Sequence, residues 1–80
     1  KMKIALFLIM CSGVAGECMP PHHFNTYTNF YDCFEAGYTE SLKKTKEVGK
    51  EQINEHKIYI RFNCVEQPRE EKQTKEKVNA

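Results

Sequence analysis

The sequence has no surplus of charge of either sign. Its 12 Lys and Arg residues and 11 Asp and Glu residues leave a formal net charge of +1, and Lys and Glu are interleaved along the chain. A protein that binds the phosphates of nucleic acid needs basic residues concentrated on one face. Anionic membrane surfaces select for the same feature. We therefore expect neither nucleic acid nor a membrane surface as a partner.

A long hydrophobic run is also lacking. One unbroken apolar run covers residues 4–11, whereas a membrane-spanning helix needs about 20 residues. Lys1 and Lys3 precede this run, and the small residues of segment 12–16 follow it. This order is typical of a signal peptide. The sequence predicts a signal peptide over residues 1–16, cleaved after Gly16, and hence a secreted or periplasmic protein. A buried core helix is the alternative interpretation of the run.

Motifs of several catalytic classes are missing. The chain holds no serine nucleophile elbow, no glycine-rich phosphate loop and no paired redox cysteines. Cys18 as a nucleophile with His22 as its base is the one combination to consider, and no other residue supports it. Because so small a chain has little room for a water-excluding pocket, we predict no enzymatic activity, no catalytic residues and no cofactor.

The cysteines become odd in number once the predicted signal peptide is removed. Cys11 leaves with the signal, and Cys18, Cys33 and Cys64 remain. In an oxidising compartment, three cysteines favour one intramolecular disulfide. The third thiol is then free or bonded to another chain.

Aromatic and apolar residues recur at helical spacing over residues 26–48. Asn25, Thr26 or Thr28 could cap the start of this helix, and Gly49 marks its end. Steps of three and four residues place one group of side chains on a common face: Tyr27, Phe30, Tyr31, Phe34, Tyr38, Leu42 and Val48. We expect this face to pack in the core. Since one strand cannot cover so many rings, either the preceding segment folds over the rest or some rings stay exposed for a partner.

Strict alternation follows over residues 58–64, after a polar connector at residues 50–57. Alternation of apolar and polar residues predicts a half-buried strand. A lone strand has unpaired backbone groups on both edges. The segment before the helix, a second copy of the chain or a target protein could pair with it, and a short hydrated strand is an equally good interpretation. We therefore predict a protein partner, or self-association, through residues 58–64.

Geometry favours a disulfide between Cys33 and Cys64. Cys33 lies about 24 Å from Gly49 along a helix, and Cys64 lies about 23 Å from Lys57 along a strand. The two sulfurs thus come to the same height if the strand folds back along the helix. Cys33 sits beside the aromatic face rather than on it, but Gly37, one turn further on, allows the strand to approach closely. Cys18 is then the free or intermolecular thiol, and a Cys18–Cys64 bond is the main competitor.

Histidines give the one hint of a metal site. His22 and His23 lie near Cys18, and His56 could join them from the connector. Adjacent histidines in an extended segment project in different directions, and the paired spacing of a zinc site is missing. We predict no metal site and keep His22 and His23 as the candidates.

These elements together predict an α+β fold. It is a small disulfide-stapled unit in which one long amphipathic helix packs against a C-terminal β-strand. The expected organisation is a signal peptide over residues 1–16, a domain over residues 17–65 and a charged, disordered tail over residues 66–80. A domain this small needs a staple because its core is small.

A sequence resemblance indicates a class of proteins but no activity. The aromatic-flanked Cys33, the pair Gly37 and Tyr38, the lysine-rich helix end before Gly49 and the segment 58–64 resemble small uncharacterised exported proteins of marine bacteria and their phages. The resemblance implies an exported unit with a single disulfide. We expect a non-enzymatic interaction module. The alternatives are a secreted effector or inhibitor, and a metal-binding protein that uses His22, His23 and Cys18.

Overall fold

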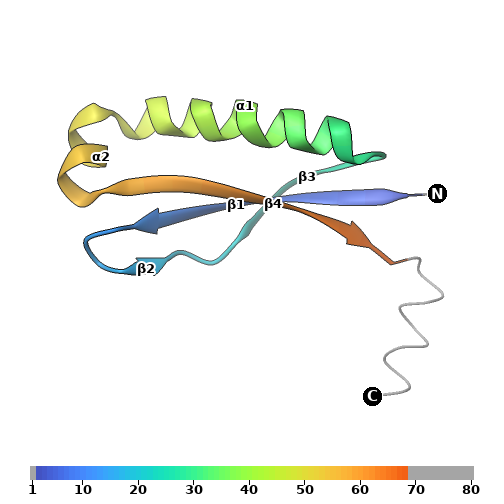
Figure 1. Ribbon diagram of the computed structural model, residues 1–80, viewed down its shortest axis with the longest axis horizontal. Coiled ribbons are helices and arrows are strands. Elements are labelled where there is room, and N and C mark those ends of the chain that lie inside the picture. The colour runs from blue at the N-terminus through green and yellow to red at the C-terminus, as the bar shows by residue number, and fades with distance from the viewer. Residues whose placement is uncertain (1, 69–80) are drawn as a thin grey trace, which may run out of the picture.

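The computed structural model describes residues 2–68 of the chain. Its elements are, in order, β1 (Lys3–Ser12), β2 (Glu17–Cys18), β3 (His22–Tyr27), α1 (Phe30–Val48), α2 (Lys50–His56) and β4 (Ile58–Gln67). The strands form one antiparallel sheet, and α1 runs along it in the same long direction (Figure 1). The predicted α+β class and the packing of a long helix against the C-terminal strand are confirmed.

β1 is the central strand of the sheet. It pairs with β4 over its whole length, from Lys3 opposite Gln67 to Ser12 opposite Ile58. On its other side it pairs with β3 and, near its end, with β2. Both faces of β1 are apolar and largely buried. Its buried residues are Ile4, Ala5, Leu6, Leu8, Ile9 and Cys11.

The structure therefore places most of the predicted signal segment inside the fold. The folded unit extends from Lys3 to Gln67, whereas the sequence predicts a domain over residues 17–65. The segment is a strand and not the core helix of the alternative interpretation. A short apolar run suits the core of a leader, a buried helix and a buried strand equally well, so the run itself did not separate them. Cleavage after Gly16 stays a prediction.

Helix α1 begins and ends with specific caps. The Asn29 side chain accepts a hydrogen bond from the Asp32 backbone N–H at 2.8 Å and donates one to the Asp32 carboxylate at 2.9 Å. These bonds satisfy a free backbone N–H, and the acidic first turn suits the helix dipole. At the other end, the Gly49 N–H donates to the Thr45 carbonyl, with φ of 95° at Gly49. The predicted stop is confirmed, but the predicted start near Thr26 is wrong because β3 continues to Tyr27.

Small residues, not aromatic ones, line the face that α1 turns to the sheet. Cys33 and Gly37 are the buried residues of α1, and a Cβ atom at Gly37 would overlap the ring of Phe62. Tyr31 is 73% exposed and Tyr38 is 70% exposed. The prediction that the aromatic face packs in the core is wrong for these residues. A helix approaches a sheet most closely on a side without bulky side chains, and the rings then lie at its flanks.

A disulfide joins the helix to the sheet at this face. Cys33 is bonded to Cys64 of β4, with their Cα atoms 6.1 Å apart. Cys33 is fully buried in a cluster with Ile4 and Leu6. The predicted pairing of Cys33 with Cys64 is confirmed, and the close approach at Gly37 is what brings the helix side within bonding reach.

The remaining segments are more regular than expected. The predicted connector over residues 50–57 contains α2. Lys57, directly after this helix, has a left-handed conformation with φ of 52°. The predicted strand over residues 58–64 begins at Ile58 as expected and continues to Gln67. Of the tail predicted over residues 66–80, the first two residues belong to β4, and residues 69–80 lie outside the described part of the chain.

Candidate functional site

The face of the sheet opposite α1 is the first candidate surface. Residues directly opposite each other in an antiparallel pair share one face, so the α1 face of β4 carries Phe62 and Cys64, and the other face carries Tyr59, Arg61 and Val65. Tyr59 is 50% exposed and Val65 is 43% exposed. We call this the open face. It combines an aromatic ring, an aliphatic side chain and a cation on a ten-residue strand.

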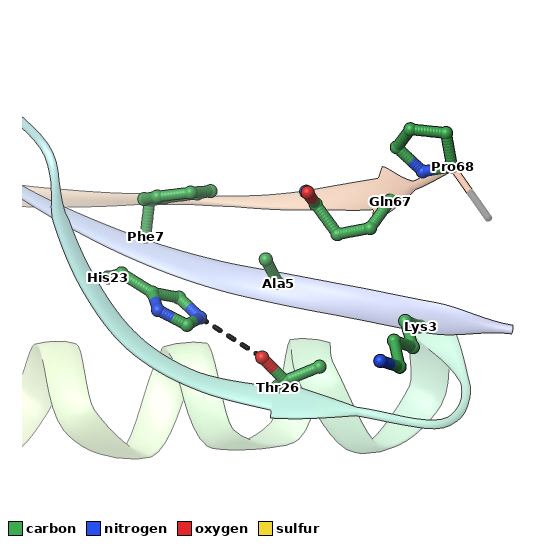
Figure 2. A pocket seen from close by; sticks show the side chains of 7 residues that line it. All are labelled: Lys3, Ala5, Phe7, His23, Thr26, Gln67 and Pro68. Atoms are coloured by element: carbon green, nitrogen blue, oxygen red, sulfur yellow. Dashed lines mark hydrogen bonds between the residues drawn. The ribbon is translucent and has the colours of Figure 1, made fainter. Parts of the chain in front are cut away.

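An open depression of about 780 Å³ lies at one end of this face. Figure 2 shows the ring of His23 close to Phe7, and a hydrogen bond between His23 and Thr26. The His23 and Phe7 ring centroids are 5.3 Å apart, with an interplanar angle of 43°. The depression offers an aromatic wall, hydrogen-bonding groups and one cation. Its lining residues are Lys3, Ala5, Phe7, His23, Thr26, Gln67 and Pro68.

The His23 and Thr26 pair combines a base with a hydroxyl group. The His23 Nε2 atom lies 3.1 Å from the Thr26 Oγ1 atom, and both residues are exposed. Activation of a hydroxyl nucleophile needs an oriented base and exclusion of water. Solvent reaches both groups here. The contact lies in β3 beside its register shift, which falls between Leu6 and Phe7 of β1.

The outer edge of β4 is the second candidate surface. Among residues 2–68, β4 pairs with β1 and with no other strand. Half of the backbone donors and acceptors of an edge strand point away from the sheet, where a further strand can pair with them. This edge includes residues 58–64, the segment in which the sequence predicts a protein contact.

Cys18 is bonded in the full chain, whereas the sequence predicts an odd thiol after removal of residues 1–16. It is bonded to Cys11, with the Cα atoms 3.9 Å apart, and all four cysteines are in disulfides. The competing Cys18–Cys64 pairing is wrong, whereas the free-thiol prediction concerns the chain without residues 1–16 and stays a prediction. Cys18 pairs with Cys11 because β1 is part of the fold of the full chain and places Cys11 directly opposite Cys18 in the ladder between β1 and β2. A disulfide-bonded sulfur is neither a nucleophile nor a metal ligand, so the Cys18 and His22 combination is also not assembled.

The histidine candidates are likewise not brought together. His22 and His23 are adjacent on β3, so their side chains leave opposite faces of the strand. His56 is at the end of α2. In the described part of the chain, no group of three or more His, Cys, Asp or Glu residues is arranged to hold a metal ion.

The depression was missed by sequence reasoning because its walls include residues of β1. Lys3, Ala5 and Phe7 fall in the segment predicted to be removed. The alternation that places Tyr59 and Arg61 on one face of residues 58–64 was visible in the sequence and does mark the open face, whereas Val65 lies beyond the predicted strand. No helix among residues 2–68 is both long and apolar enough to span a membrane.

Comparison of the chain with protein-family models, with curated proteins and with solved structures finds no match in any of the three. The resemblance to exported proteins of marine bacteria and phages therefore stays a prediction.

Proposed function

We propose that the protein is a small exported interaction module without catalytic activity. It binds a protein partner by adding a strand of that partner to the outer edge of β4. The observation that carries this proposal is the length of the edge: β4 has ten residues, Ile58–Gln67, and among residues 2–68 it pairs with β1 alone. Strand addition uses backbone hydrogen bonds for affinity and alternate side chains for specificity.

The side chains beside this edge support the proposal. Tyr59 and Val65 are exposed large side chains on the open face, and Arg61 lies between them. Aromatic residues and arginine are enriched among the residues that dominate binding energy at protein interfaces. Such side chains are available to a partner that continues the sheet.

The Cys33–Cys64 disulfide supports export to an oxidising compartment. It joins α1 to β4 and does not involve residues 1–16, and structural disulfides persist outside the reducing cytosol. The leader-like order of residues 1–16 points the same way. We assign the protein to the periplasm or the extracellular medium on these grounds.

The test compares variants of two exposed surfaces. The immobilised exported protein is used to capture binding proteins, and capture is repeated with the double variant Tyr59→Lys and Val65→Lys. Lysine on an edge strand opposes strand addition. The matched control is Tyr31→Lys, which places the same charge on the exposed side of α1.

The expected result is a binding protein that the wild type and Tyr31→Lys retain and the double variant loses. Light scattering of the purified protein over a concentration series tests a second copy as the partner in the same way. A binder that all three forms retain, or no binder and no self-association, contradicts the proposal.

A further inference from the structure

One segment of the chain has two properties that conflict. β1 is the central strand, with β4 on one side and β2 and β3 on the other. The same residues have the order of a cleavable leader, and the predicted cut after Gly16 lies in the exposed turn between β1 and β2. Export with removal of the leader would therefore take the central strand out of the sheet.

The contacts show what would remain. β4 would lose its strand partner, and β2 and β3 would lose theirs, because each of them pairs with β1. The link between α1 and β4 would persist, since Cys33–Cys64 and the Gly37–Phe62 approach do not involve β1. We call the space that β1 occupies between β4 and β3 the β1 slot. Helix α1 covers one side of this slot.

The lining of the β1 slot is apolar. Ile4 and Leu6, both fully buried, contact a cluster around Cys33. The partly buried residues packed against this cluster are Tyr27, Ala36, Phe62 and Cys64. Without β1 these apolar side chains would face water, which is unfavourable. The inner backbone edge of β4 would be open to pairing with another strand.

We propose that the exported, leader-free protein is a strand acceptor, and that an extended apolar segment of a partner protein fills the β1 slot. The inference rests on the export proposed above and goes beyond it, because it concerns the inner edge of β4. β1 itself specifies the chemistry of the occupant. Large aliphatic side chains occur at alternate positions facing α1, as at Ile4, Leu6 and Leu8, which are at most 6% exposed.

The slot also has a distinctive rim. Cys18 is bonded to Cys11 of β1, so loss of residues 1–16 leaves Cys18 without its partner at the end of the slot. Pro20 and Pro21 follow directly and cannot donate backbone hydrogen bonds. The segment between β2 and β3 is thus poorly suited to fill the slot from within the chain.

The experiment begins with the full chain expressed for export in a bacterial host. The intact mass of the purified product fixes its N-terminus, and the expected product begins at Glu17. A product that still contains residues 3–12 overturns the inference, because the slot is then filled by the chain's own strand. The proposed binding at the outer edge of β4 is unaffected by that result.

The probe is a synthetic peptide with the sequence of residues 3–12, Cys11→Ser, carrying terminal lysines for solubility and a fluorophore. Binding to the exported protein with one-to-one stoichiometry is expected. A peptide with Leu6→Asp and Leu8→Asp should bind at least about a hundredfold more weakly, because two carboxylates would be buried. The matched peptide with Phe7→Ser changes the open face at a partly buried position and should bind within about tenfold of the parent.

Variants of the acceptor complete the test. Phe62→Ala should weaken peptide binding, and Tyr59→Ala, on the open face of the same strand, should not. If the exported product aggregates, the parent peptide should restore a monomer and the Asp peptide should not. A folded product that does not bind the parent peptide, or that binds all three peptides with equal affinity, overturns the inference.

Discussion

The two faces of the sheet differ in how they are stabilised. On the α1 face, Ile4 and Leu6 are fully buried against the helix, and the Cys33–Cys64 bond joins the two layers. On the open face, Tyr59 is half exposed, and the Cys11–Cys18 bond joins two neighbouring strands of the same layer. Stability should therefore depend mainly on the α1 face, and the open face is left available for contacts with other molecules.

Removal of the interlayer disulfide should have the largest effect. In the full chain, Cys33→Ala opens a covalent link between residues 31 positions apart, which costs about 3–4 kcal/mol in the chain-entropy model. A small core supplies a margin of similar size, so we expect a largely unfolded protein. Far-UV circular dichroism with urea titration checks this. A cooperative transition at the wild-type midpoint would contradict the claim that stability depends mainly on the α1 face.

Removal of the disulfide on the open face should cost less. Cys18→Ala opens a link across only 7 positions, worth about 2–3 kcal/mol by the same estimate. The urea midpoint should fall, and the transition should remain cooperative. The companion variant Cys11→Ala should give the same midpoint. A greater loss than for Cys33→Ala would contradict the ranking of the two faces.

Addition of a methyl group beneath α1 should have an intermediate effect. Gly37→Ala places a Cβ atom against the Phe62 ring, and overpacking costs about 1–3 kcal/mol, of which better helix propensity offsets about 1. The double variant with Phe62→Val removes the obstructing ring. In a double-mutant cycle, the methyl group should be less harmful in the Phe62→Val background. Equal effects in both backgrounds would mean that Gly37 does not set the helix position.

Truncation on the open face should have the smallest effect. Tyr59→Thr removes a half-exposed ring and keeps a β-branched residue in the strand. We expect a change of at most about 0.5 kcal/mol in the free energy of unfolding, as for other surface substitutions. Urea unfolding beside the wild type measures it. A loss above 2 kcal/mol would show that the open face is part of the core.

The parts of the fold that the sequence predicted correctly are those with a clear period. The helix end at Gly49, the strand start at Ile58 and the Cys33–Cys64 bond follow from local patterns and from simple distances along a helix and a strand. Gly37 was the decisive residue, because its missing side chain explains how a cysteine beside the aromatic face reaches the sheet.

The parts that could not be predicted depend on contacts between distant segments. An apolar run of eight residues does not show whether a strand will pair with it on each side. The central position of β1 and the Cys11–Cys18 bond were therefore not predicted. The aromatic residues of α1 showed a valid helical period, but a period alone does not show which side of the helix packs against the sheet. The small-residue side, with Cys33 and Gly37, was the one that allowed close contact.

The position of the Cys11–Cys18 bond makes the order of events decisive. The bond spans the exposed turn that contains Gly16. If the chain oxidises before it is cut, the first fragment remains attached to the rest through sulfur, and only a reducing gel separates the two pieces. If the cut comes first, that fragment diffuses away. The timing of oxidation relative to proteolysis therefore decides which molecule results. One is cut after Gly16 and keeps β1 in its sheet through the disulfide. The other lacks β1 and needs a strand from a partner protein.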